Sequence, residues 1–261
     1  MIRALYTART GMMGQQLQLD AVSNNLANVN TAGFKKSRVQ FEDLFYQEVQ
    51  AVGVDTVNGN QVPTGIQVGM GSKPAAVEKI FTQGDLAETG NDLDWAIQGP
   101  GFFKVVHNGQ EYYTRAGMFK RDSDGYIVTS EGDRLQPEFA IPPETATLTI
   151  DQDGLLTAKD ANQNILASTQ VTLFTFMDPA GLESEGGNLY MATPSSGDPI
   201  ENNPGVKGTG TIMQKYMETS NVDITEELIN LITTQRAYEV NSKAIQTADQ
   251  LMQISNSLKQ S

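Results

Sequence analysis

The stretch ITEELINLITTQRAYEVNSKAIQTADQLMQISNSL, residues 224–258, contains neither proline nor glycine and repeats apolar side chains every seven residues. Seven residues are nearly two turns of an α-helix, so the repeated side chains form a narrow row along one face. A second row runs beside it. The first row is Ile224, Leu231, Tyr238, Ile245 and Met252, with Leu228 one turn after its start, and the second is Ala237, Ala244, Leu251 and Leu258. This pattern predicts a long C-terminal helix that packs against other helices, and Asp223 with Glu226 three residues later has the spacing of a capping box at its start.

The N-terminus has the same seven-residue spacing, in Leu5, Met12, Leu19 and Leu26. The helical pattern runs from Ile2 to about Asn28, and residues 28–33 end it because Asn and Thr compete for backbone hydrogen bonds and Gly33 can adopt a positive φ. The two helices would be roughly 40 and 50 Å long at 1.5 Å per residue. Polar Gln15, Gln235 and Asn241 beside the rows favour helix-to-helix packing, in a coiled coil, over the alternative that both helices pack on a globular body.

The middle of the chain changes to short β-prone runs separated by turn residues. Residues 102–106 and 111–114 flank Asn108-Gly109, which is typical of a two-residue hairpin turn. Asp124-Gly125 should turn a second pair, 118–120 with 126–128, and Asp153-Gly154 a third, 148–150 with 155–157. Residues 171–176 predict a further strand. We therefore expect an α+β fold, with paired terminal helices around a mainly antiparallel β domain.

Four segments follow from these patterns. Residues 51–71 are poor in charge and rich in Gly, Val, Asn and Gln, with Asn58-Gly59 as their best turn, and read as an extended loop or long hairpin. The expected organisation is an N-terminal coiled-coil helix (1–33), an extended connector or long hairpin (34–75), a β-rich outer domain (76–217) and a C-terminal coiled-coil helix (218–261).

Composition excludes several classes of function. Lys and Arg total 18 against 31 for Asp and Glu, giving a formal net charge of -13, so the chain should repel nucleic-acid phosphates. It has no cysteine, which excludes disulfides, thiolate nucleophiles and cysteine-bound metals. No run approaches the roughly 18 apolar residues of a membrane span, so no membrane insertion is expected. Gly11 and several glutamines interrupt the N-terminal region, which predicts either a cytoplasmic protein or export without a cleaved signal peptide.

Candidate catalytic groups are few. His107 is the only histidine and sits at a predicted hairpin tip, so a catalytic triad or a histidine zinc site would need improbable partners. Asp92 and Asp94 are a carboxylate pair that a glycosidase could use, but we interpret them as solvated loop charges. Trp95 is expected to anchor the β core.

Two aspartate-rich turns resemble calcium loops only in part. Residues 122–125 and 151–154 lack the full acidic spacing and the bidentate Glu of such loops, so turn formation explains them. Residues 69–73 resemble a phosphate-binding loop superficially, but Ser precedes Lys and Pro74 follows. The sequence predicts no catalytic, cofactor or metal residues.

Three stretches resemble one family. Residues 23–35, SNNLANVNTAGFK, are similar to the N-terminal signature of bacterial flagellar rod and hook proteins. Residues 82–103, continued by YTRAG at 113–117, resemble the entry to the β domain of that family, and YMETSNV at 216–222 with QRAYE and NSK resembles its closing helix. The likeness covers essentially the whole chain and is closest to the distal rod members, by length and by residues 46–71. Its motif residues are Asn24, Asn25, Leu26, Ala27, Asn28, Thr31, Gly33, Phe34 and Lys35.

The resemblance implies an axial structural protein of the flagellar basal body. Copies of the chain would stack helically into a rigid hollow rod that spans the periplasm, transmits torque from motor to hook and passes exported subunits. The implied partners are other copies of the chain, proximal rod proteins, hook protein, the surrounding basal-body ring proteins and the flagellar type III export machinery. No cofactor is implied. The expected subunit contacts are Leu5, Met12, Leu19, Leu26, Ile224, Leu228, Leu231, Tyr238, Ile245 and Met252.

Three alternatives stay open. The chain could be another axial protein of the flagellum, from the proximal rod or the hook. It could be a carbohydrate hydrolase built on the β body, or a binding protein that displays this body on a coiled-coil stalk. The rod interpretation also predicts that residues 46–71 stiffen the polymer and that Asn24, Asn25 and Asn28 lock the end of the first helix.

Overall fold

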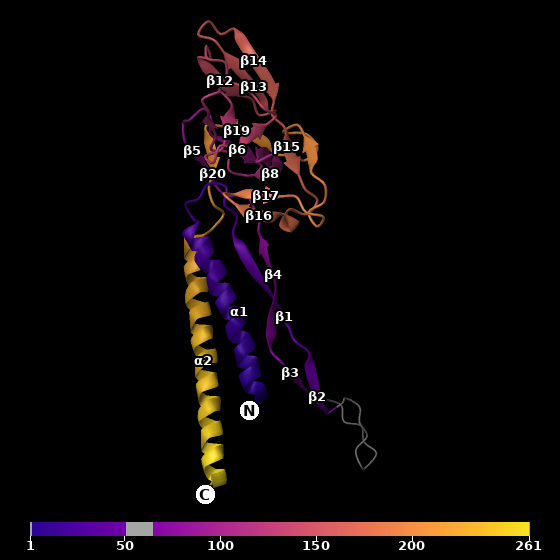
Figure 1. The fold of residues 1–261 in the computed structure, drawn as a ribbon, viewed down its shortest axis with the longest axis vertical. Coiled ribbons are helices and arrows are strands. Elements are labelled where there is room, and N and C mark those ends of the chain that lie inside the picture. Colours follow the sequence, from indigo (N-terminus) through magenta and orange to yellow (C-terminus); the bar gives the residue numbers. More distant parts are fainter. Residues whose placement is uncertain (1, 51–64, 261) are drawn as a thin grey trace. The chain divides into compact units, whose positions relative to one another are not determined.

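The computed structural model describes residues 2–50 and 65–260, so the predicted Asn58-Gly59 turn lies outside the described residues. The chain forms two units (Figure 1). Residues 1–26, 37–78 and 223–261 make up the first, here called the helical unit, and residues 27–36 and 79–222 make up the second, the β unit.

The helical unit contains both predicted terminal helices. These are α1 (Ile2–Ala27) and α2 (Ile224–Gln260), within two residues of the predicted bounds. Asp223 caps α2 as expected, because its Oδ1 accepts hydrogen bonds from the Thr225 and Glu226 backbone N–H groups at 2.8 and 3.2 Å. Two strand pairs complete the unit: β1 (Ser37–Asp43) with β4 (Ser72–Lys79), and β2 (Tyr46–Gln50) with β3 (Ile66–Gly69), the latter antiparallel.

Glycines in α1 allow neighbouring segments to approach closely. A Cβ at Gly11 would lie 3.0 Å from Asn241 Nδ2, so α1 and α2 are adjacent at this point (Figure 1). A Cβ at Gly14 would lie 2.9 Å from Cε1 of Phe41, a β1 residue. The missing side chains cost intrinsic helix stability but give room for these contacts.

The β unit is built from short antiparallel strands. Its largest sheet has seven strands in the order β16-β17-β8-β7-β11-β10-β9, a second has the order β12-β13-β14, and three further pairs are β15-β18, β19-β6 and β20-β5. The first ten of these strands are β5 (Leu86–Glu88), β6 (Trp95–Gln98), β7 (Phe103–His107), β8 (Gln110–Thr114), β9 (Lys120–Arg121), β10 (Ile127–Val128), β11 (Arg134–Gln136), β12 (Thr147–Ile150), β13 (Leu155–Lys159) and β14 (Ile165–Gln170). The others are β15 (Leu173–Thr175), β16 (Glu183–Gly186), β17 (Leu189–Met191), β18 (Ile200–Asn202), β19 (Thr211–Gln214) and β20 (Tyr216–Glu218), with a short 3-10 helix η1 (Pro179–Gly181).

The predicted hairpins are present. Asn108 and Gly109 have φ values of 51° and 81° between β7 and β8, the positive values that a type I′ turn requires. Gly125 and Gly154, with φ of 89° and 83°, turn β9 into β10 and β12 into β13. The mainly antiparallel β domain expected from the sequence is therefore confirmed.

The core of the β unit is centred on Trp95, which is fully buried as predicted. Its ring packs edge-to-face on Phe119, which contacts Phe103 in the same way. The prediction that Asp94 is a solvated loop charge is wrong: Asp94 is buried and accepts a hydrogen bond from Asn91 Nδ2 at 3.1 Å. Asp92 is half exposed and pairs with Lys215 at 3.1 Å.

Candidate functional site

A fully buried ion pair lies within the β unit. Lys35 Nζ is 2.6 Å from Glu218 Oε1, and both side chains have an exposed fraction of 0%. Arg115, also buried, brings its Nε to 3.0 Å from Glu218 Oε2. We call these three residues the ionic cluster. Buried charges are costly unless they are paired and hydrogen-bonded, so this cluster holds its neighbours in one arrangement.

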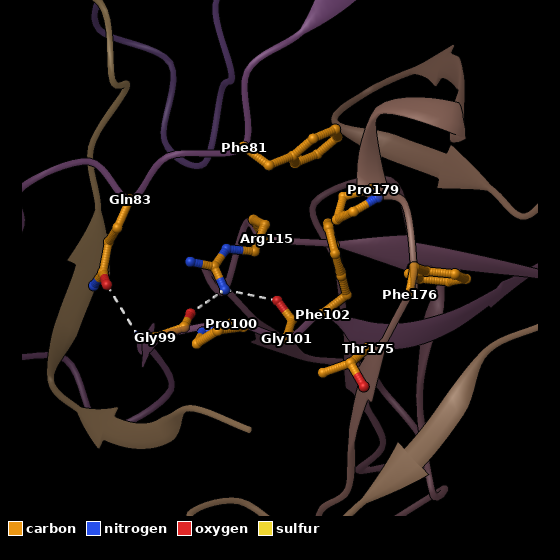
Figure 2. A pocket seen from close by; sticks show the side chains of 10 residues that line it. All are labelled: Phe81, Gln83, Gly99, Pro100, Gly101, Phe102, Arg115, Thr175, Phe176 and Pro179. Carbon is orange, nitrogen blue, oxygen red and sulfur yellow. Dashed lines mark hydrogen bonds between the residues drawn. The ribbon is translucent and has the colours of Figure 1, made fainter. Parts of the chain in front are cut away.

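Backbone groups add further hydrogen bonds to the cluster. Lys35 Nζ donates to the Thr82 carbonyl at 2.7 Å, and the Gly84 N–H donates to Glu218 Oε1 at 3.0 Å. Arg115 Nη1 donates to the carbonyls of Gly99 and Gly101 at 2.8 and 2.6 Å (Figure 2). The cluster therefore fastens loops that are far apart in the sequence.

Gly33 lets the motif segment enter the β unit. Its N–H donates to the Glu218 carbonyl at 2.8 Å, and its φ is +71°. A Cβ at this position would lie 2.7 Å from the Ala116 backbone nitrogen, closer than real Cβ atoms approach. Glycine is required here both for its left-handed conformation and for the space.

Burial shapes the electrostatics of this region. Desolvation lowers the pKa of Lys35, while the nearby Glu218 carboxylate opposes that shift. Burial also raises the pKa of Tyr113 to about 12, with Glu111 and Glu201 adding to the effect. Burial raises the pKa of Tyr190 as well.

The asparagines of the motif form local hydrogen bonds. Asn25 is buried; its Nδ2 donates to the Ser37 carbonyl at 2.9 Å and its Oδ1 accepts from the Ser37 N–H at 2.8 Å. The Asn28 carbonyl accepts from the Thr31 N–H at 3.1 Å, and Asn28 Oδ1 accepts from Thr31 Oγ1 at 3.2 Å. Asn24, Leu26 and Ala27 are not buried. The expected lock at the helix end thus has direct contacts for Asn25 and Asn28.

The rest of the motif packs in the β unit. Phe34 is buried, and Lys79 Nζ stands 4.9 Å from its ring centroid. Asn221 fastens the segment from the other side, since its Oδ1 accepts from the Lys36 N–H at 2.8 Å and its Nδ2 donates to the Ile80 carbonyl at 2.8 Å. The structure therefore brings parts of the three family-like stretches together in the β unit: Gly33 and Lys35 of the first, Thr82 and Arg115 of the second, and Glu218 and Asn221 of the third.

The expected subunit contacts are only partly covered by their own chain. Leu5, Met12, Leu19 and Leu26 on α1 and Leu231, Ile245 and Met252 on α2 are half-buried, while Ile224, Leu228 and Tyr238 are exposed. The most buried row of α2 lies three residues further on, at Glu227, Thr234 and Ala248, with half-buried Asn241 between them. Within one chain, the buried row of α2 consists of small and polar side chains. Its large apolar side chains stay partly or largely exposed.

Further apolar side chains of α2 are exposed; Leu251 belongs to the second seven-residue row, whereas Ile229 and Val240 belong to neither row. Ile229, Val240 and Leu251 are exposed and lie eleven residues apart, close to three helical turns, so they share one face. An eleven-residue spacing was the signal that could have grouped Ile229 and Val240 with Leu251.

A pocket lies beside the ionic cluster, within the β unit (Figure 2). Its volume is about 290 Å³, and its walls are largely aromatic and proline side chains with the Arg115 guanidinium among them. Sequence reasoning missed both this pocket and the pairing of Arg115 with Glu218, because the contributing residues are spread over more than a hundred positions. Within residues 2–50 and 65–260, no group of three or more acidic or histidine side chains is placed to hold a metal ion.

The helices of the described residues include none that is long and apolar enough to cross a membrane. His107 is partly exposed and contacts Asp133. It lies at the end of β7, at the hairpin tip expected from the sequence.

Comparison with known proteins gives consistent matches along the chain. Residues 5–35 match the family described as flagella basal body rod protein, residues 96–158 the flagellar hook protein FlgE/F/G D1 domain, and residues 213–258 the flagellar basal body rod FlgEFG protein C-terminal.

Full-length relatives agree. The flagellar basal-body rod protein FlgG of Buchnera aphidicola subsp. Schizaphis graminum is 46% identical, over 97% of this chain and 98% of the relative. The proteins of the same name from Borreliella burgdorferi and Caulobacter vibrioides are 44% and 43% identical, each over 99% of this chain and at least 99% of the relative. The resemblance drawn from the sequence is confirmed, and the chain belongs to the FlgG family of flagellar basal-body rod proteins.

Proposed function

We propose that this chain is a structural subunit of the flagellar distal rod, which assembles helically with other copies of itself. The observation that carries the proposal is the uncovered apolar surface of α2. Ile229, Val240 and Leu251 are exposed and lie outside the row of α2 that its own chain covers. Each such side chain stabilises a contact by about 1.5–3 kcal/mol when buried, and a helical lattice repeats the contact.

In this proposal α1 and α2 pair as a coiled coil and form the inner wall of a hollow rod. Leu5, Met12, Leu19, Leu26, Ile224, Leu228, Leu231, Tyr238, Ile245 and Met252 would then contact neighbouring helices. The adjacency of Gly11 and Asn241 supports pairing, and the exposure of Ile224, Leu228 and Tyr238 leaves them available. The rod would span the periplasm, transmit torque from motor to hook and pass exported subunits.

The partners of the rod follow from the same proposal. They are the proximal rod proteins, the hook protein, the ring proteins around the rod and the type III export machinery, which would export the chain without cleaving a signal peptide. The proposal assigns no catalytic role to any residue.

The connector is proposed to stiffen the rod. The described parts of residues 46–71 form the β2–β3 pair, where Tyr46, Val49 and Ile66 expose apolar surface that a neighbouring subunit can cover. A chain without residues 46–71 should form more flexible polymers, visible as curved filaments by electron microscopy. Filaments as straight as those of the parent would contradict this part of the proposal.

Electron microscopy of concentrated protein tests the assembly itself. The parent should form open helical polymers, whereas a stalked binding protein would form a small closed oligomer. Val240→Glu with Leu251→Glu should prevent polymerisation by placing charge in the apolar contact. Gln246→Glu with Gln253→Glu adds the same charge at exposed polar positions of α2 and should still polymerise. Polymers from the first variant would contradict the proposed role of this face.

A further inference from the structure

The pocket of the β unit is large enough for a single aromatic side chain. Its volume is about 290 Å³. A cavity of roughly 150 Å³ can hold a benzene ring, and pockets for larger organic ligands span roughly 300–1,000 Å³. The walls suit a ring as well: Phe81, Phe102, Phe176, Pro100 and Pro179 line the space around Arg115 (Figure 2).

The pocket also has an uneven charge. The ionic cluster beside it holds two cations, Lys35 and Arg115, and one carboxylate, Glu218. The carbonyls that accept hydrogen bonds from Arg115 satisfy its donors without carrying a full charge. An occupant with a carboxylate next to its ring is therefore favoured over a neutral or basic one.

Phe45 is the most exposed aromatic side chain of the described residues, and it matches these requirements. It lies between β1 and β2 with an exposed fraction of 93%, the highest among the large hydrophobic residues of the described parts. Asp43, an exposed carboxylate, is two residues earlier. By contrast, exposed Ile165 and Val240 lack a ring, and Met177 directly follows the pocket residue Phe176.

We propose that the pocket of the β unit receives the Phe45 side chain of a second copy of this chain, with Asp43 of that copy facing the Arg115 guanidinium in the pocket wall. The inference rests on the proposed function, since it presumes self-assembly, and it specifies one contact of the assembly. The ring would make edge-to-face contacts with Phe81, Phe102 and Phe176, which already pack on one another or on Tyr190 in this manner.

Photo-crosslinking within the assembled protein tests the contact. The full chain would carry p-benzoyl-phenylalanine at position 45 and be assembled with a nitrogen-15-labelled copy that lacks the photo-reactive residue. Crosslinked peptides identified by mass spectrometry should join position 45 of one copy to pocket residues such as Phe81, Phe176 or Pro179 of the labelled copy. The same photo-reactive residue at position 165 serves as the control and should not label the pocket.

The contribution of the ring is measured separately. Phe45→Ala should raise the protein concentration needed for polymerisation by about ten- to a hundredfold, the equivalent of one buried Phe. Ile165→Ala, which removes exposed apolar surface elsewhere, should change it less than twofold. An equal rise in both variants would contradict a specific role for Phe45.

The outcomes separate the two proposals. Polymers whose crosslinks map outside the pocket, or inside the same copy, would overturn this inference and leave the proposed function standing. If the parent forms no polymer under any condition that keeps it folded, the proposed function fails and the inference fails with it.

Discussion

Lys35 and Glu218 are 183 positions apart in the chain, yet their side chains meet at 2.6 Å with no exposure to solvent. The contact joins the end of the N-terminal motif to the last strand of the β unit. Arg115 shares the same carboxylate, so one acidic group holds two basic ones. Removing the Glu218 carboxylate therefore affects three segments of the chain.

Glu218→Gln should lower the free energy of unfolding by about 3–5 kcal/mol, because it leaves the buried charges of Lys35 and Arg115 without their partner. Lys35→Met should cost less, because Arg115 still pairs with Glu218. Urea denaturation followed by circular dichroism measures the change. Lys215→Ala is the matched control: it breaks the half-exposed pair with Asp92 and should cost at most about 1 kcal/mol. Equal losses in the buried and exposed pairs would contradict the importance of the cluster.

Gly33→Ala should destabilise the β unit more than Gly90→Ala. The two glycines have nearly the same φ, +71° and +72°, so both variants incur roughly 1–2 kcal/mol of backbone strain. At Gly33 the new Cβ also meets the Ala116 backbone nitrogen at 2.7 Å, whereas at Gly90 it meets nothing within 4 Å. We expect a further loss of about 1–3 kcal/mol for Gly33→Ala. Indistinguishable unfolding curves for the two variants would show that the backbones at residues 33 and 116 move apart at little cost. That outcome would contradict the predicted difference.

Stability should fall at alkaline pH through the buried tyrosines. Burial raises the pKa of Tyr113 to about 12, above the ordinary value of 10.0. Between these values the unfolded chain releases a proton that the folded chain retains, so the stabilisation present below pH 10 is lost as the pH rises toward 12. One such group changes the free energy of unfolding by up to about 1.4 kcal/mol per pH unit.

Tyr113→Phe tests this effect, because it keeps the ring and removes the titrating group. Its free energy of unfolding, measured in urea between pH 8 and 11.5, should decline less steeply above pH 10 than that of the parent. The lowered pKa of Lys35 acts in the opposite direction, but it is common to both proteins. Tyr6→Phe, an exposed position on α1, is the control and should leave the slope unchanged. A parent-like slope in Tyr113→Phe would rule out its contribution.

The helical unit should be less protected than the β unit before assembly. Among the helix residues whose burial the structure describes, only Ala8, Val22 and Ala248 are buried apolar residues, while eighteen residues form the main core of the β unit. Helices without packed partners are marginally stable. Hydrogen exchange on dilute monomer should show fast exchange in residues 224–258 and slow exchange in β6, β7 and β13. Strong protection along α2 would contradict this expectation.

Much of the fold was predictable from local patterns. Both helices, the Asp223 cap, the hairpin turns at Asn108-Gly109 and Asp153-Gly154, and the burial of Trp95 follow from spacing and turn chemistry within a few neighbouring residues. The helix bounds were predicted closely because capping and helix-ending residues act over one turn.

The ionic cluster and the pocket were not predictable in this way. Lys35, Arg115 and Glu218 are polar residues that ordinarily lie at the surface, and only long-range contacts bury them. Asp94 was misjudged for the same reason, since its burial depends on the loop at Asn91 and not on its own neighbours in a pattern. The buried row on α2 was missed because Thr234 and Glu227 carry no apolar signal.

The division of the chain between the two units has a mechanical consequence. The backbone passes from one unit to the other at residues 26/27, 36/37, 78/79 and 222/223, and therefore four times. A single tether would act as a swivel, whereas four covalent links share any load and must all deform before one unit can twist against the other. If the chain is part of a drive shaft, as proposed above, four links would transmit torque through each subunit with little internal rotation. This holds however the neighbouring copies are arranged.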